Sequence, residues 1–236
     1  RSAAENFKRV SLELGGKSPN IVFEDADLDD AVKGVVTGIF AASGQTCMAG
    51  SRALVHSSVH DEFVERLVAF MKDVKLGDPR KPETQVGPIA THAQYEKILQ
   101  YIEIAKEEGA NCVLGGRKAD RPECGDGWFV EPTIFTNISN NMRIAQEEVF
   151  GPVLSVLKFD TEEQAVEIAN DVLYGLAAGM VWVNAYRVVS YMAPFGGYKN
   201  SGLGRENGMA AIHEYLETKS VFINPKPGIP NPFVLG

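Results

Sequence analysis

Apolar residues recur along the chain at two spacings, one typical of strands and one typical of helices. Short runs rich in apolar and β-branched residues predict strands at residues 10–14, 20–24, 53–56, 112–114, 128–135, 152–159, 177–184 and 220–224. Apolar residues three and four positions apart predict helices at residues 28–40, 60–74, 92–108, 162–170 and 209–216, the first of them capped by Asp27. Because strands and helices alternate, we expect an α/β fold with an open, mostly parallel twisted sheet flanked by helices.

The composition of the chain is that of an ordinary globular protein. Its 236 residues are 44% hydrophobic and 23% charged, which suffices for one well-filled core. The net charge of −8 argues against a nucleic-acid-binding protein, which needs a basic surface to neutralise phosphates. No run approaches the roughly 18 consecutive apolar residues that span a bilayer. We therefore expect neither a nucleic acid nor a membrane as a partner.

Three cysteines, Cys47, Cys112 and Cys124, lie far apart in the sequence. An odd number without a CxxC pair predicts neither a disulfide framework nor a metal knuckle, and it favours a reducing compartment such as the cytoplasm. His56 and His60 are four residues apart, but they straddle a predicted strand-to-helix boundary and lack the HExxH pattern. The sequence therefore predicts no metal site.

Cys47 lies in a segment of small residues, GQTCMAGSR, between a predicted helix and a predicted strand. Such a loop can present a side chain to a cleft, with backbone N–H groups free to donate hydrogen bonds. A buried structural thiol fits the same position, because free cysteine is among the most buried residue types. The local sequence leaves both interpretations open.

Glu13 raises a similar question, because it stands within the apolar run VSLEL. A solvent-facing position on the strand would explain it. In a strand buried on both faces, as in parallel sheets, the carboxyl group would instead be desolvated, and a raised pKa would make it a competent base near neutral pH. Gly15 and Gly16 follow directly and would let a flat ligand approach the backbone.

Two longer motifs join Glu13 and Cys47 in one family pattern. LELGGKSPNIVFEDADLDDAV, at residues 12–32, resembles the glutamate signature of aldehyde dehydrogenases, and FAASGQTCMAGSR, at residues 40–52, resembles their cysteine signature. Three further segments match in order and spacing: QEEVFGPV at 146–153, VWVN at 181–184 and PFGGYKNSGLGRE at 194–206. Over nearly its whole length, the chain thus resembles the catalytic portion of NAD(P)-dependent aldehyde dehydrogenases.

The resemblance implies oxidation of an aldehyde to a carboxylic acid, with NAD or NADP as the cofactor. The Cys47 thiolate would attack the carbonyl carbon, and the Cys47 backbone N–H would hold part of the thiohemiacetal oxyanion. Hydride would pass to nicotinamide, and a water deprotonated by Glu13 would hydrolyse the resulting thioester. We expect the pKa of Cys47 to be lowered locally, because an ordinary thiol is mostly protonated at pH 7.

The resemblance also implies a cofactor site. Glu148 and Phe150 would contact the nicotinamide ribose and ring, with Glu147 a rival for the ribose contact. The backbone of Leu14 and Gly15 would line the nicotinamide pocket. Alternatively, the two glutamates form a solvated turn and Phe150 belongs to the core.

The substrate side of the site is less specified. Phe195 resembles the aromatic wall of the aldehyde tunnel, with Tyr186 and Val189 as neighbours, whereas Asn184 and the pair 205–206 are interpreted as scaffolding. The partner is a small-molecule aldehyde whose identity the sequence does not specify. We expect a homo-oligomer, a dimer or tetramer, because the strand predicted at 220–224 could pair between subunits.

The chain departs from the family pattern in two places. It begins just before the glutamate signature, so we expect residues 1–14 to end a cofactor-binding domain whose remainder is absent. Residues 15–223 would form the catalytic domain, and residues 224–236, rich in proline, an extended tail. Between Gly179 and Met180 about one helix with its turns is missing. The alternative function is therefore that of an inactive fragment with only an oligomerisation or structural role.

Overall fold

The computed structural model describes residues 2–176, 179–186 and 188–225, and its centre is a five-stranded sheet. Three of its neighbouring strand pairs are parallel and the edge pair β4–β5 is antiparallel. The strand order across the sheet is β2 (Pro19–Val22), β3 (Arg52–His56), β6 (Val153–Phe159), β5 (Thr133–Thr136) and β4 (Asn111–Leu114). The predicted fold class, α/β with a mostly parallel sheet, is confirmed.

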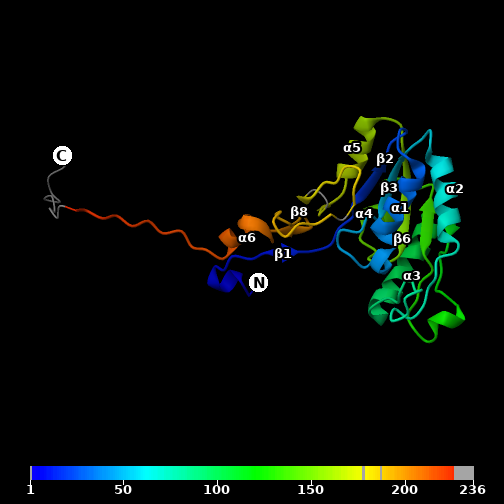
Figure 1. Ribbon diagram of the computed structural model, residues 1–236, viewed down its shortest axis with the longest axis horizontal. Coiled ribbons are helices and arrows are strands. Elements are labelled where there is room, and N and C mark those ends of the chain that lie inside the picture. Colours follow the sequence, from blue (N-terminus) through cyan, green and yellow to red (C-terminus); the bar gives the residue numbers. More distant parts are fainter. Residues whose placement is uncertain (1, 177–178, 187, 226–236) are drawn as a thin grey trace.

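Helices cover both faces of this sheet (Figure 1). On β3, Ala53 and Val55 join the core beneath α1 and α2, whereas Leu54, between them, packs on the opposite face with α5. This alternation follows from the two-residue period of a strand. One face carries α1 (Leu28–Ile39) and α2 (His60–Met71), and the other carries α3 (His92–Glu107), α4 (Arg143–Gln146) and α5 (Glu162–Asn170).

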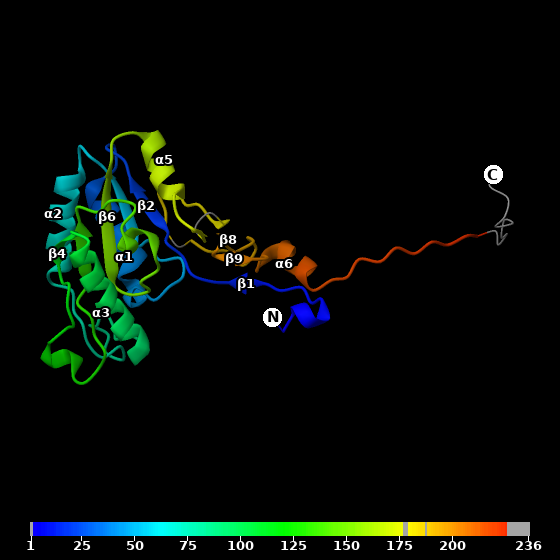
Figure 2. The ribbon, with the colours of Figure 1, turned by 180° about the vertical axis from the view of Figure 1, so that it is seen from behind.

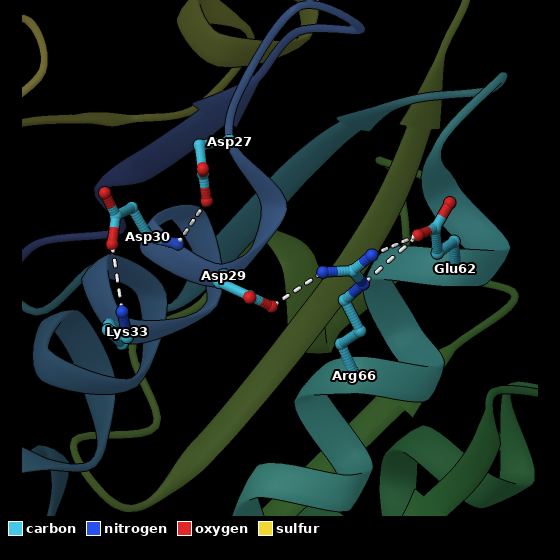
Figure 3. Close-up of polar contacts among 6 residues, drawn as sticks. All are labelled: Asp27, Asp29, Asp30, Lys33, Glu62 and Arg66. Carbon is cyan, nitrogen blue, oxygen red and sulfur yellow. Dashed lines mark hydrogen bonds and ion pairs between the residues drawn. The ribbon is translucent and has the colours of Figure 1, made fainter.

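Helix α1 begins where the sequence predicts. The Asp27 carboxylate accepts a hydrogen bond from the Asp30 N–H at 3.0 Å, which satisfies one of the unpaired donors of the first turn. At the surface, Arg66 of α2 donates to Asp29 of α1 and to Glu62 one turn earlier in α2 (Figure 3). The apolar face of α1 is buried through Val32, Val35 and Ile39.

A second, smaller part of the chain lies beside the sheet (Figures 1 and 2). Strand β1 (Leu12–Glu13) pairs antiparallel with β9 (Gly202–Leu203), and β7 (Tyr174–Gly175) pairs antiparallel with β8 (Tyr198–Lys199). The remaining elements are α6 (Gly208–Glu214) and three short 3-10 helices, η1 (Ala4–Asn6), η2 (Ala41–Gly44) and η3 (Pro122–Cys124).

Two of the strand predictions are wrong. Residues 220–224 belong to no described strand or helix, and Phe222 is 94% exposed. The strand predicted at 177–184 is absent from its described part, residues 179–184, where Val181 and Val183 are about 80% exposed and Asn184 has a φ of 51°. Both segments have strand-like sequences, but a strand needs a neighbouring strand, and among the described residues neither segment is part of a sheet.

Two further strands are shorter than predicted. Only Leu12–Glu13 of residues 10–14 is a strand, and in place of residues 128–135 the structure has a strand at Thr133–Thr136, β5. Pro132 stands directly before β5 and cannot donate to the ladder. Most of the predicted tail, residues 226–236, lies outside the described residues. Within the described residues, no helix is both long and apolar enough to cross a membrane.

Candidate active site

The segment that carries Cys47 connects the end of α1 to the start of β3. After α1 the chain reverses through η2, where Ala42 and Ser43 adopt left-handed φ angles of 52° and 54°. The Ser43 hydroxyl donates to the Gly87 carbonyl at 2.9 Å, which fixes this reversal against a distant loop. Cys47 follows in a turn and is half-buried. The sequence therefore placed Cys47 correctly in a loop between a helix and a strand.

Gln45 fastens the same segment to the residues that precede α3. Its amide nitrogen donates to the Pro88 carbonyl at 3.2 Å, and its amide oxygen accepts from the Ala90 N–H at 2.9 Å. Both ends of one side chain are thus bonded to backbone, which restricts the loop that holds the cysteine.

Protein groups occupy the space beside Gly15 and Gly16: a side chain at Gly15 and backbone at Gly16. A Cβ atom on Gly15 would lie 2.4 Å from a carboxylate oxygen of Glu148, and one on Gly16 would lie 2.2 Å from the Cys47 carbonyl oxygen. The Gly16 N–H donates to the other oxygen of Glu148 at 2.9 Å. The glycine pair therefore brings the Cys47 segment and the Glu148 carboxylate together on one stretch of backbone.

Glu13 is not in a strand buried on both faces, as one interpretation of its sequence required. It is exposed, in the two-stranded β1–β9 ladder. Its pKa is nevertheless raised, first by partial burial and then by the negative charge of Glu206. Glu206, which the sequence assigned to the scaffold, also exchanges two backbone hydrogen bonds of 2.7 Å with Phe195. No pattern in the sequence signalled that Glu206 acts on Glu13, because the pairing of β1 with β9 is not readable from it.

The pKa of Cys47 is raised rather than lowered, so that expectation was wrong. Burial is the largest cause, and the negative charges of Glu13 and Glu148 add to it. Backbone N–H groups of Met48 and Cys47 act in the opposite direction and lower the pKa of the thiol. The thiol is thus close enough to both carboxylates for their charges to raise its pKa, and within the described part of the chain the groups that favour the thiolate belong to its own loop.

The two neighbouring glutamates have different surroundings. Glu147 is paired with Arg143, with N–O distances of 2.9 Å, and accepts a hydrogen bond from the Tyr101 hydroxyl. These contacts lower the pKa of Glu147 to about 2. Glu148 instead turns toward Gly16 and the cysteine loop. Of the two rivals for the ribose contact, Glu148 is the one whose charge acts on Cys47.

Phe150 has a left-handed φ of 59°, which is uncommon for a bulky residue. The Gln94 amide of α3 donates to the carbonyl of Val149 at 2.7 Å and to that of Phe150 at 2.9 Å. These two bonds hold the backbone in the strained conformation. Neither the strain nor the part played by Gln94 can be read from the sequence.

Lys17 is a buried charge that the sequence analysis overlooked. It is 2% exposed, and burial together with the nearby Arg52 guanidinium lowers its pKa to about 7, against the attraction of Glu148 and Glu147. In the sequence, the position of Lys17 directly after the two glycines could have indicated that it is buried near the site. The Lys17 carbonyl oxygen also accepts a hydrogen bond from Arg52 at 3.1 Å.

The three residues expected on the substrate side occupy different environments. Phe195 is half-buried and its backbone pairs with Glu206, whereas Val189 is 50% exposed. The Tyr186 hydroxyl contacts backbone at both ends of the cysteine loop.

Arg205 fits its assignment as scaffolding. Its guanidinium donates to the Gly197 and Gly204 carbonyls and lies 4.4 Å from the centre of the Tyr198 ring. Asn184 is exposed.

A shallow cavity of about 10 Å³ joins residues from three of the sequence motifs, among them Gly16, Thr46, Glu148 and Phe150. A larger cavity of about 300 Å³ lies elsewhere, between residues 72–84 and the residues Arg121 and Glu123. The small cavity has room for about one water molecule and is bordered by residues that flank Cys47 and by Glu148, whereas the larger cavity contains no residue of the motifs.

Comparison with protein-family models gives a match to the aldehyde dehydrogenase family over residues 1–180 and 176–221. Betaine aldehyde dehydrogenase of Bacillus subtilis is 45% identical over 252 residues, which are 99% of this chain and 51% of the relative. Betaine aldehyde dehydrogenase of Mesorhizobium japonicum is 45% identical over 240 residues, 94% of this chain and 49% of the relative. The chain spans about half the length of the curated relatives it matches.

Solved structures give the same result. Betaine aldehyde dehydrogenase from Staphylococcus aureus in complex with NAD+ superposes with a TM-score of 0.95 and 42% identity, over 98% of this chain and 50% of that one. The NAD+ complex of an aldehyde dehydrogenase from Bacillus cereus superposes with a TM-score of 0.90 and 44% identity, over 96% and 49%. The family match over most of the chain, the motifs and the fold agree, and this chain belongs to the aldehyde dehydrogenase family.

Proposed function

We propose that this chain provides the acyl-transfer half of an enzyme that oxidises an aldehyde to a carboxylic acid with NAD+ or NADP+. The observation that carries the proposal is the meeting of Cys47, Glu13 and Glu148 around the glycine pair. Gly16 contacts the Cys47 carbonyl and binds Glu148, and the charge of Glu13 reaches the Cys47 thiol.

Cys47 is the nucleophile in this proposal. Its thiolate forms a C–S bond to the aldehyde carbon, and the carbonyl electron pair moves to oxygen, where the Cys47 backbone N–H stabilises the negative charge. Before that step the Met48 and Cys47 N–H groups stabilise the thiolate. The raised pKa means that only a small share of Cys47 is ionised at neutral pH.

Glu13 is the base for the second half of the reaction. Its raised pKa, caused by burial and Glu206, increases its basicity toward water. It takes a proton from a water molecule whose oxygen attacks the thioester carbon. The C–S bond then breaks, the electron pair returns to sulfur, and the carboxylic acid leaves.

The residues present fit one end of a nicotinamide cofactor, which supplies the hydride acceptor when bound. The Glu148 carboxylate, held by the Gly16 N–H, retains lone pairs that can accept from ribose hydroxyls. Phe150 is fixed beside it by Gln94, and the backbone of Leu14 and Gly15 completes this side. The relatives solved with NAD+ support NAD+ as the first cofactor to test.

For the aldehyde, Phe195 and Val189 are the proposed contacts. Phe195 is tied through its backbone to Glu206, whose charge acts on Glu13, and this connection supports a role for Phe195 on the same side of the site as the base. Betaine aldehyde is the first substrate to test, because several relatives at 43–45% identity carry that name.

In the proposed organisation, residues 1–14 end a cofactor-binding domain, residues 15–223 form the catalytic domain, and a tail begins at residue 224. A helix is missing at Gly179–Met180. Two findings support this gap. The family model matches in two pieces that meet at residues 176–180. The alignment with the Mesorhizobium japonicum relative has 240 positions but includes only 94% of the 236 residues, so about 18 of its positions have no residue of this chain.

Assembly and location are also proposed. The exposed apolar segment that includes Val221, Phe222 and Ile223 supports pairing with another copy of the chain in a dimer or tetramer. Three free cysteines support a reducing compartment, the cytoplasm.

The nucleophile is tested with the 236-residue chain itself. We expect no measurable turnover of betaine aldehyde with NAD+, because this chain carries about half of its relatives' length, but slow hydrolysis of 4-nitrophenyl acetate and selective alkylation of Cys47 by iodoacetamide. Cys47→Ser should abolish both, whereas the matched variant Cys112→Ser should keep both. If Cys47→Ser leaves ester hydrolysis and alkylation unchanged, Cys47 is not the nucleophile.

A further inference from the structure

The hydroxyl group of Tyr186 lies among three backbone groups at the base of the cysteine loop. It is 3.1 Å from the Gly38 carbonyl oxygen, 3.1 Å from the Met48 carbonyl oxygen and 3.1 Å from the Gly50 nitrogen. The hydroxyl accepts from the Gly50 N–H and donates its proton to one carbonyl at a time. Gly50 also donates to Gly38 at 3.0 Å, so the two ends of the loop meet at this point.

This position bears directly on the nucleophile. Gly38 lies in the last turn of α1, and Gly50 stands two residues before β3, so the hydroxyl closes the segment that carries Cys47. Met48 follows Cys47 directly and its N–H stabilises the thiolate. Among the described residues, the Met48 carbonyl accepts a hydrogen bond from Tyr186 alone.

The ring of Tyr186 fits this place closely. A Cβ on Gly38 would lie 3.3 Å from its Cζ atom, and the Trp182 ring lies 5.8 Å away at an angle of 51°. Tyr186 is 138 residues from Met48 in the sequence, so the contact fixes the loop from outside its own segment. A group bonded in this way to backbone on both sides of a nucleophile restrains its position.

We infer that Tyr186 is a positioning residue for the Cys47 loop: its hydroxyl holds the Met48 and Gly50 backbone so that the thiol and the oxyanion-binding N–H keep their places. This inference rests on the proposed role of Cys47 as nucleophile. It replaces the expectation that Tyr186 contacts the aldehyde, because its polar atom is directed to backbone.

The test compares Tyr186→Phe with Tyr191→Phe in the 236-residue chain. Tyr191 is 81% exposed. Its variant loses the same hydroxyl group, but the inference gives Tyr191 no role in the Cys47 loop. The probe is iodoacetamide at pH 8, with mass-spectrometric quantification of Cys47, Cys112 and Cys124 in the same sample. Because iodoacetamide is small and is not an aldehyde, loss of a substrate contact would not change its rate.

We expect Tyr186→Phe to slow alkylation of Cys47 about tenfold, the effect of one lost hydrogen bond on a placed group. The kcat for 4-nitrophenyl acetate should fall to a similar extent with KM unchanged, and Cys112 and Cys124 should react as in the wild type. Tyr191→Phe should leave all rates within twofold.

Three results would overturn the inference. Unchanged Cys47 alkylation with a raised KM would make Tyr186 a substrate contact. Faster reaction of the buried Cys124 in Tyr186→Phe would mean that the residue supports the fold in general. Equal effects of Tyr191→Phe would mean that the hydroxyl contact is not specific. If wild-type Cys47 reacts no faster than Cys112, it is the proposed nucleophile that fails.

Discussion

The carbonyl oxygen of Cys47 lies against the backbone of Gly16, so closely that a Cβ on Gly16 would be 2.2 Å from it. Real Cβ atoms do not approach oxygen to this distance, and the obstructing group is backbone, which cannot rotate away. Gly16 is therefore required by the nucleophile segment itself.

Gly16→Ala should consequently displace the Cys47 peptide. We expect hydrolysis of 4-nitrophenyl acetate and alkylation of Cys47 to fall at least about tenfold, because a small misplacement of a reacting group is costly. The matched control is Gly34→Ala in α1, where a Cβ meets nothing within 4 Å. That variant should be stabilised by about 0.5–1 kcal/mol, since alanine favours a helix over glycine, and should keep full reactivity. Wild-type reactivity in Gly16→Ala would refute the contact.

Glu13 should have opposite effects on the two halves of the reaction. Its negative charge raises the pKa of Cys47, so Glu13→Gln lowers that pKa and increases the thiolate fraction at pH 8. We expect alkylation of Cys47 to accelerate about two- to fivefold, the scale of a charge interaction near a protein surface. Release of acid from the acyl-enzyme should instead slow by about 10²-fold or more, because the base is gone.

The control for this prediction is Glu103→Gln. Glu103 raises the pKa of Cys112, so the variant should accelerate alkylation of Cys112 and leave Cys47 unchanged. In the wild type, the alkylation rate of Cys47 should keep rising through pH 9, because its pKa lies above the ordinary value of 9.0. Slower alkylation of Cys47 in Glu13→Gln would show that the two groups are not coupled in this way.

The main sheet and its helices could be predicted because their signals are local. Asp27 caps α1 where a capping residue precedes an apolar stripe, and helix α5 has the predicted bounds, Glu162–Asn170. Strand-like sequence alone was not sufficient at residues 179–184 and 220–224, because a strand needs a neighbouring strand and the sheets of the described residues include neither segment.

The sequence predicted which residues belong to the site better than it predicted their pKa values. Cys47 and Glu13 were named from motifs, but the direction of the Cys47 pKa shift was wrong, because burial and two carboxylates outweigh the loop N–H groups. The action of Glu206 on Glu13 follows from the β1–β9 pairing, which joins segments about 190 residues apart and has no local signal. Long-range contacts of this kind depend on tertiary structure.

Glu147 should stabilise the fold in a pH-dependent way. Its pKa falls from 4.5 to about 2 in the folded chain, because Arg143 and Tyr101 bind the carboxylate. A depressed pKa gives stability that is complete above about pH 4.5 and is lost as the pH falls toward 2. At pH 7 we expect Glu147→Gln to lower Tm slightly, with an effect of at most about 1 kcal/mol since the pair is partly exposed. The Tm difference from wild type should shrink between pH 5 and 3.

Thermal melts at pH 7, 5, 4 and 3 measure this effect, with Glu65→Gln as the control at an exposed helix position. A Tm difference that stays constant over this range would show that the Glu147 carboxylate is not held by its two partners.

Arg52 and Arg66 provide the clearest contrast between a buried and an exposed guanidinium. Arg52 is 0% exposed and donates to the carbonyls of Lys17, Ile168 and Ala169, so it joins the segment before β2 to the end of α5. Burial lowers its pKa to about 10, which leaves it charged at neutral pH. Arg66 bonds Asp29 and Glu62 at the surface (Figure 3).

Arg52→Met should therefore destabilise the chain by at least about 3 kcal/mol, because it removes a donor from one buried and two half-buried carbonyls. Arg66→Met also removes several hydrogen bonds but leaves groups that water can solvate, so we expect a loss of at most about 1 kcal/mol. Equilibrium unfolding in urea at pH 7 measures both. Arg52→Lys should recover little of the loss, since one ammonium cannot reach both Lys17 and the end of α5 in the way the forked guanidinium does. Equal losses in Arg52→Met and Arg66→Met would show that the hydrogen bonds of Arg52 do not hold these elements together.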